Sequence, residues 1–295
     1  MPQGSIPSIQ KNISEPFEAN KDHSAERGFD NIVGLFGMPR SGTTIISRLV
    51  ANHSRVRKII EPYQRRRASQ YSQTNIQLLC SDFDVREESG VSLLVKETTT
   101  RLANIENLSA LMETSARKGY RVGYICVLRS PWEAFLSQVE AVETLWSVRS
   151  AFGKKEISLR NFWNTFTRSV RTLRQAMQEM DGRFVVFDCF LERPEDETRS
   201  LMQLFGYEFE TNQMKLERAD PAFGGDPRAG ATIGPVSPDP GQARSAQMAE
   251  LENLFGKMPE YAAIQKMHAF VKSAAEKQPQ QKAIAAELDL ITRAR

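Results

Sequence analysis

The segment from Asn31 to Ile46, NIVGLFGMPRSGTTII, constrains the fold of this chain more than any other. A short apolar run ends at Gly37, a turn follows, and an apolar-periodic helix pattern begins at Gly42. Glycine adopts positive φ and has no Cβ, so the backbone N–H groups of such a turn can surround an anion closely. The first turn of the helix adds unpaired N–H groups and the positive end of the helix dipole. The segment therefore predicts a strand, a phosphate-binding loop and a helix.

The residue after Gly42 decides which phosphate ligand is expected. A loop for nucleoside triphosphates has Lys directly after its second Gly, where it reaches the β and γ phosphates. Here Thr43 occupies that position, and the cation Arg40 lies inside the loop instead. A P-loop kinase or NTPase with this loop would lack its main phosphate lysine. A Gly-rich turn that binds no ligand is the other alternative.

The run GMPRSGTT resembles the 5′-phosphosulfate loop of sulfotransferases, in the PRSGTT form of tyrosylprotein and many bacterial members. The resemblance implies transfer of a sulfuryl group from 3′-phosphoadenosine 5′-phosphosulfate (PAPS) to an acceptor hydroxyl of a small molecule or carbohydrate. The product nucleotide would be adenosine 3′,5′-bisphosphate, and no metal would be required. The loop residues that the resemblance assigns to the nucleotide are Arg40, Ser41, Gly42, Thr43 and Thr44.

Glu61 is the candidate general base. Ile59 and Ile60 indicate a short buried strand that ends just before it, near the loop. A Glu that caps a helix or pairs at the surface is the alternative. In PRSGTT sulfotransferases a Glu at a similar distance beyond the loop Arg is the base, and Glu61 lies twenty-one residues after Arg40. The resemblance therefore assigns proton abstraction to Glu61.

Lys96 is the second candidate catalytic residue, together with Arg40. The apolar run from Val91 to Thr99 predicts a strand with Lys96 near its end, where a side chain points into the crevice that binds ligands in parallel sheets. A surface Lys that extends along apolar neighbours into water is the alternative. In the resembled family a Lys in a Lys-Asp/Glu motif contacts the bridging oxygen of the phosphosulfate, and Lys96-Glu97 matches that placement.

A second motif lies around Arg129. The near-continuous apolar run from Val122 to Leu128 is typical of a central parallel strand, and Pro131 favours the start of a helix. Such a run could be ordinary strand–helix structure. Sulfotransferases have an Arg at the end of this strand and a Ser eight residues later, both bound to the 3′-phosphate, as Arg129 and Ser137 are spaced here. Ser130 replaces the usual Asp or His.

The rest of the chain gives weaker signals. The run Phe184 to Phe190 predicts a further strand, and a helix after it is expected to stop at Gly206. Residues 207–241 are rich in Gly and Pro and could form a simple linker. In the resembled family a loop here covers the nucleotide, which makes Arg228 a candidate contact. The basic run Arg65–Arg67 predicts a solvated face, with binding of an acidic acceptor as the alternative.

Short apolar strands that alternate with helices predict an α/β fold, a three-layer sandwich of P-loop type with a mainly parallel sheet flanked by helices. We expect a flexible N-terminal arm at 1–28 and a single sulfotransferase-like domain at 29–295 with C-terminal helices. The arm contains no apolar run, so we expect no signal peptide and no membrane anchor.

Composition narrows the function classes. A net charge of +3 suits an anionic ligand but is too small to indicate nucleic-acid binding. Three widely spaced cysteines favour buried thiols in a reducing, cytoplasmic compartment, and with three His they show no metal-ligand spacing. A catalytically inactive nucleotide-binding protein remains an alternative, which the presence of Glu61 and Lys96 disfavours.

Overall fold

The computed structural model describes residues 28–63, 73–98, 102–144, 181–215 and 255–277, together with residues 160, 162–168, 170, 249, 252 and 253. The predicted arm lies outside these residues except for Gly28. Of the residues proposed from the sequence, Arg65–Arg67 and Arg228 also lie outside the described part of the chain.

The described strands form one five-stranded sheet in the order β2-β3-β1-β4-β5. Every neighbouring pair is parallel. The strands are β1 (Asn31–Gly37), β2 (Val56–Ile60), β3 (Ser92–Thr98), β4 (Arg121–Leu128) and β5 (Asp181–Val186). The predicted α/β fold with a parallel sheet flanked by helices is confirmed.

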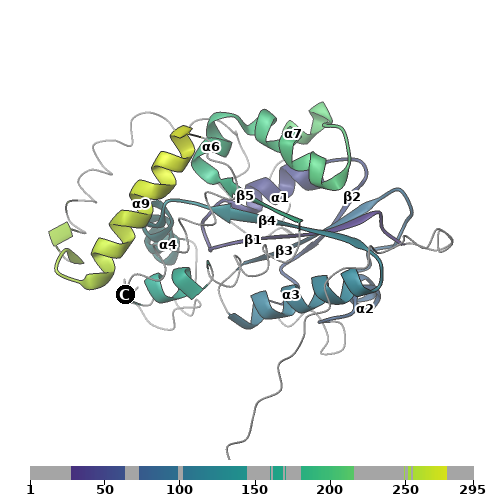
Figure 1. Ribbon diagram of the computed structural model, residues 1–295, viewed down its shortest axis with the longest axis horizontal. Coiled ribbons are helices and arrows are strands. Elements are labelled where there is room, and N and C mark those ends of the chain that lie inside the picture. The colour runs from purple at the N-terminus through teal and green to yellow at the C-terminus, as the bar shows by residue number, and fades with distance from the viewer. Residues whose placement is uncertain are drawn as a thin grey trace, which may run out of the picture.

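Helices cover both faces of the sheet (Figure 1). On one face lie α1 (Thr43–Ala51), α6 (Phe187–Glu192) and α7 (Pro194–Phe205), and on the other lie α2 (Ile76–Asp82) and α3 (Leu102–Arg117). The helices α4 (Pro131–Thr144) and α9 (Pro259–Lys277) pack against each other beyond the ends of the strands. A short 3-10 helix, η1 (Thr211–Met214), packs against α1. None of the helices that the structure describes has the length and hydrophobicity needed to cross a membrane.

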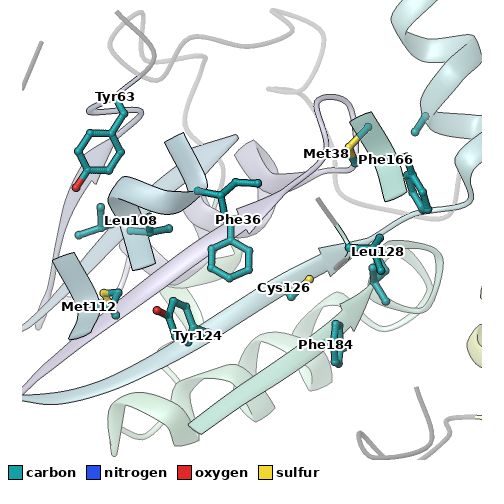
Figure 2. Close-up of a cluster of buried hydrophobic side chains, with 14 of the residues drawn as sticks. Phe36, Met38, Tyr63, Leu108, Met112, Tyr124, Cys126, Leu128, Phe166 and Phe184 are labelled. Carbon is teal, nitrogen blue, oxygen red and sulfur yellow. The ribbon is translucent and has the colours of Figure 1, made fainter. Parts of the chain in front are cut away.

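Two apolar clusters fill the spaces between the sheet and these helices. The strand β1 is buried along its whole length, as expected for a parallel sheet covered on both faces. The cluster under α1, α6 and α7 includes Val33, Leu35, Ile46, Leu49, Leu94, Ile125, Leu201 and Phe205. In the opposite cluster, Phe36 of β1 lies beside Tyr124 of β4, with ring centroids 5.3 Å apart (Figure 2).

The prediction of a strand from Phe184 to Phe190 is wrong in its second half. The strand β5 ends at Val186, and α6 begins at Phe187, so that Cys189 lies in a helix. An apolar run by itself does not distinguish a buried strand from a buried helix. Here Phe187 and Phe190, three residues apart, are both buried and their rings stack, which is a helical spacing. Cys80, Cys126 and Cys189 are buried thiols, as predicted.

The strand order indicates where a ligand is expected to bind, at the end of β1. The chain runs from β1 to the sheet edge at β2, returns through β3, and then crosses to β4 on the other side of β1. In open parallel sheets, ligands bind at such a reversal, outside the carboxyl ends of the strands. Gly37, the last residue of β1, lies opposite Thr98 of β3 and Val127 of β4. We call the side of the sheet where these strands end the carboxyl edge.

Candidate functional site

The loop from Met38 to Gly42 joins β1 to α1 at the carboxyl edge, and we call it the phosphate loop. Gly42 is the N-cap of α1 and has a φ of 93°, which favours glycine. A Cβ on Gly42 would lie 2.0 Å from Cε2 of Phe187, and one on Gly37 would lie 2.8 Å from the carbonyl oxygen of Val127. Close approach to β4 and α6 therefore requires glycine at both ends of the loop.

The backbone of the phosphate loop is fixed by hydrogen bonds from three directions. Within the loop, the Ser41 hydroxyl donates to the carbonyl of Met38 at 2.6 Å. From α4, Gln138 donates its side-chain amide to the carbonyl of Pro39 at 3.1 Å. From the end of β4, Arg129 donates Nη1–H to the carbonyl of Arg40 at 2.7 Å. These bonds fix the loop at the start of α1, which has no side-chain cap at its N-terminus.

Arg40, Arg129 and Ser137 come together from three elements. The side chain of Arg40 donates Nε–H to the Ser137 hydroxyl at 3.0 Å, although the two residues are 97 positions apart in the sequence. The guanidinium of Arg129 lies 3.6 Å from the carboxylate of Glu133 and over the ring of Phe187, 5.3 Å from its centroid. Two guanidinium groups therefore share one side of the carboxyl edge, next to the N-terminus of α1. This set of donors suits a ligand with several anionic groups.

Glu61 and Lys96 form an ion pair on the other side of the phosphate loop. Their strands pair side by side, with Ile60 opposite Lys96. The Nζ of Lys96 donates to Oε1 of Glu61, and the side chain of Lys96 is only 1% exposed whereas that of Glu61 is 24% exposed. The alternative of a surface Lys at position 96 is therefore wrong. A buried ammonium is costly unless it has an anionic partner, and Glu61 is such a partner.

Glu97 also lies in this region, and we predicted no function for it from the sequence. It is buried, and its Oε2 accepts the Tyr63 N–H at 3.0 Å while its Oε1 accepts the Thr98 N–H at 2.8 Å. The Asn104 amide lies 3.5 Å from the same Oε1. Burial raises the pKa of Glu97 to about 7, with a further upward contribution from Glu61, although these N–H groups and Lys96 act in the opposite direction. A Glu at the end of an otherwise apolar strand is the signal that could have marked it.

A second unpredicted side chain lies beside Ser130. The Ser130 hydroxyl is 2.5 Å from Nδ1 of His268, which comes from α9. Burial lowers the pKa of His268 from its ordinary value, so the neutral imidazole is favoured. Where the sulfotransferase pattern has Asp or His directly after its Arg, this chain has a Ser that contacts a His from another helix.

Comparison with known proteins shows a fold and no family. No family model matches the chain, and no curated protein matches it. Among solved structures, a sulfotransferase domain from the curacin biosynthetic pathway matches with a TM-score of 0.52 and 14% identity, covering 83% of this chain and 99% of that domain. This chain has the fold of a sulfotransferase domain. A sulfotransferase domain from the olefin synthase of Synechococcus PCC 7002 matches with a TM-score of 0.47 and 12% identity, over 77% of this chain and 95% of that one. At such identities the likeness concerns the fold, and the PRSGTT subtype rests on the loop residues alone.

The raised pKa of Glu97 predicts a distinctive pH dependence of stability. Between the ordinary value of 4.5 and about 7, the folded protein binds more protons at this carboxyl than the unfolded chain does. The free energy of unfolding that depends on Glu97 should therefore fall as the pH rises through this window, by up to about 3 kcal/mol. The ionisable groups that interact electrostatically with Glu97 are Lys96 on β3, and Glu61 and Tyr63, which follow β2.

Urea unfolding of the wild type and of Glu97→Gln at pH 5, 6, 7 and 8 measures this effect. The wild type should lose stability relative to the variant as the pH rises to 7, and the difference should level off above that. Parallel stability curves for the two proteins would contradict the assignment.

Proposed function

We propose that this protein is a sulfotransferase that moves a sulfuryl group from PAPS to a hydroxyl group of an acceptor. The acceptor would be a small molecule or a carbohydrate. The observation that most supports the proposal is the joining of Arg40 and Arg129 at the carboxyl edge, through the bond from Arg129 to the Arg40 carbonyl. The sulfotransferase fold supports it independently.

In this proposal the nucleotide lies across the carboxyl edge. Arg40 and the backbone of Ser41 to Thr44 at the start of α1 would bind the 5′-phosphosulfate. Arg129 and Ser137 would bind the 3′-phosphate, so that Ser137 would exchange its bond with Arg40 for one with the ligand. Outside the described residues, Arg228 stays a candidate contact. When bound, PAPS supplies an activated sulfuryl group. The protein would lower the barrier to transfer by positioning the reactants and stabilising the developing charge.

Transfer requires a base and a cation at the reacting centre. Glu61 would accept the proton of the acceptor hydroxyl as the acceptor oxygen forms its bond to sulfur. The bond between sulfur and the bridging oxygen would break in the same step, and Lys96 and Arg40 would stabilise the charge left on the 5′-phosphate. The ion pair between Lys96 and Glu61 places the two groups next to each other before the reaction.

Two alternatives are disfavoured by particular residues. A P-loop kinase or NTPase would have Lys at position 43, where this chain has Thr43. A catalytically inactive nucleotide-binding protein would need no general base, and the presence of Glu61 paired with Lys96 disfavours it.

Replacing Glu61 tests the base. Glu61→Gln should lower turnover by about 10² to 10⁴-fold, while the affinity for adenosine 3′,5′-bisphosphate stays within about twofold of the wild type. The assay follows ³⁵S from labelled PAPS into a panel of hydroxyl-bearing acceptors, and calorimetry gives the affinity. Glu88→Gln is the matched control, because Glu88 pairs with Arg57 at the surface near the opposite end of β2. Unchanged turnover in Glu61→Gln would exclude Glu61 as the base.

Replacing Arg129 tests the 3′-phosphate site. Arg129→Ala should weaken binding of adenosine 3′,5′-bisphosphate by about 10- to 100-fold, because a charge-assisted hydrogen bond is lost. Binding of adenosine 5′-phosphate should also weaken, because the bond that fixes the Arg40 carbonyl is lost, but by a smaller factor. Arg199→Ala, which removes an exposed Arg paired with Glu195 on α7, should affect neither nucleotide. An equal loss for both nucleotides in Arg129→Ala would refute the assignment.

A further inference from the structure

The backbone of Glu61 is in the left-handed conformation, with a φ of 51°. L-residues adopt this conformation at a cost, so it persists only where neighbouring groups hold it. In the part of the chain that the structure describes, it is shared by only two other non-glycine residues, Arg40 and Asp84. Arg40 and Glu61 are both candidate functional residues, and both lie at the carboxyl edge.

Two hydrogen bonds to acceptors on β3 hold the segment that contains Glu61. The Glu61 N–H donates to the carbonyl of Lys96 at 2.7 Å, which continues the pairing of β2 with β3. Two residues later, the Tyr63 N–H donates to Oε2 of Glu97 at 3.0 Å. The backbone from Glu61 to Tyr63 is therefore held at both ends by consecutive residues of β3.

Lys96 and Glu97 act on opposite sides of the same turn. Successive residues of a strand point to opposite faces of the sheet, and Lys96 reaches the Glu61 carboxylate while Glu97 reaches the backbone beyond it. The Tyr63 side chain is itself buried, and its hydroxyl donates to the carbonyl of Gln73 at 3.0 Å. The turn is thus attached to the core by the Tyr63 side chain. The Glu97 carboxylate links the backbone of the same residue to β3.

We propose that Glu97 is a positioning residue, which holds Glu61 in its left-handed conformation through the Tyr63 N–H and so directs the Glu61 carboxylate toward Lys96 and the acceptor hydroxyl. The catalytic consequence rests on the proposed sulfuryl transfer. Among the residues that the structure describes, Glu97 accepts hydrogen bonds from two backbone N–H groups and, at 3.5 Å, from the Asn104 amide of α3.

A purely structural role predicts a different outcome. A buried carboxylate is costly, and its raised pKa shows that cost. If Glu97 only filled the core, its replacement would change stability and leave the rate of the folded enzyme unaltered. If it positions the base, its replacement must also change the turn at Glu61 and the turnover number.

The test compares Glu97→Gln with the wild type. The comparison is made at pH 8, above the pKa of about 7 of the wild-type carboxyl. Gln keeps the shape but has one acceptor oxygen where the ionised Glu97 has two, so one backbone N–H loses its partner. Hydrogen exchange at the Tyr63 amide should become at least about tenfold faster, and kcat should fall by about 10- to 100-fold, as expected for an orphaned donor. The affinity for adenosine 3′,5′-bisphosphate should stay within about twofold.

Ser92→Ala is the matched control. Ser92 is a buried polar residue at the opposite end of β3, and its hydroxyl bonds to the Tyr207 hydroxyl at 2.8 Å. This variant should lose stability without a change in kcat or in exchange at Tyr63. If Glu97→Gln does not fold, Glu97→Asp serves in its place, because it keeps the charge and withdraws the carboxylate from Tyr63 by one methylene.

Each outcome decides the proposal. Unchanged exchange at Tyr63, or faster exchange with unchanged kcat, would overturn it. If the wild type transfers no sulfuryl group to any acceptor, the proposed function fails, and the three-bond coupling between the amide and α protons of Glu61, which reports its φ, then decides the positioning separately. A coupling that changes between wild type and Glu97→Gln supports the positioning, and a constant coupling overturns it.

Discussion

The hydrogen bond from Arg129 to the carbonyl of Arg40 is the contact on which the candidate site depends. It joins the end of β4 to the phosphate loop after β1 and brings a second guanidinium to the same edge of the sheet. Like charges that share an edge repel each other, and the Glu133 carboxylate and the Phe187 ring offset this repulsion for Arg129. An anionic ligand with two phosphate groups would offset it further, because each guanidinium could bind one group.

The strand β3 contributes the second half of the site through two consecutive residues. Lys96 neutralises Glu61, and Glu97 fixes the backbone beyond it, so the geometry of Glu61 depends on one short segment of the core. Both β3 side chains are buried, whereas Glu61 is partly exposed. The arrangement leaves the candidate base accessible to an acceptor while the groups that orient it are shielded from water.

Local patterns in the sequence predicted the strands β1, β3 and β4 and the glycine-bracketed turn, since these features depend on residues close together in the chain. The meeting of Arg40 with Ser137 depends on the folded sheet, and only the resemblance to sulfotransferases placed the two at one ligand. Glu97 was missed because its partners, Tyr63 and Asn104, come from other elements. The start of α6 at Phe187 was missed because a short apolar run fits a strand and a helix equally well.

The most direct test of the account is which nucleotide the protein prefers. Isothermal titration calorimetry can compare adenosine 3′,5′-bisphosphate without metal with ATP in the presence of Mg²⁺. In the proposed site Arg129 and Ser137 would bind a 3′-phosphate, and position 43 has no lysine for a γ-phosphate. The bisphosphate should therefore bind at least about tenfold more tightly. Tighter binding of ATP with Mg²⁺, or no measurable binding of the bisphosphate, would contradict the account.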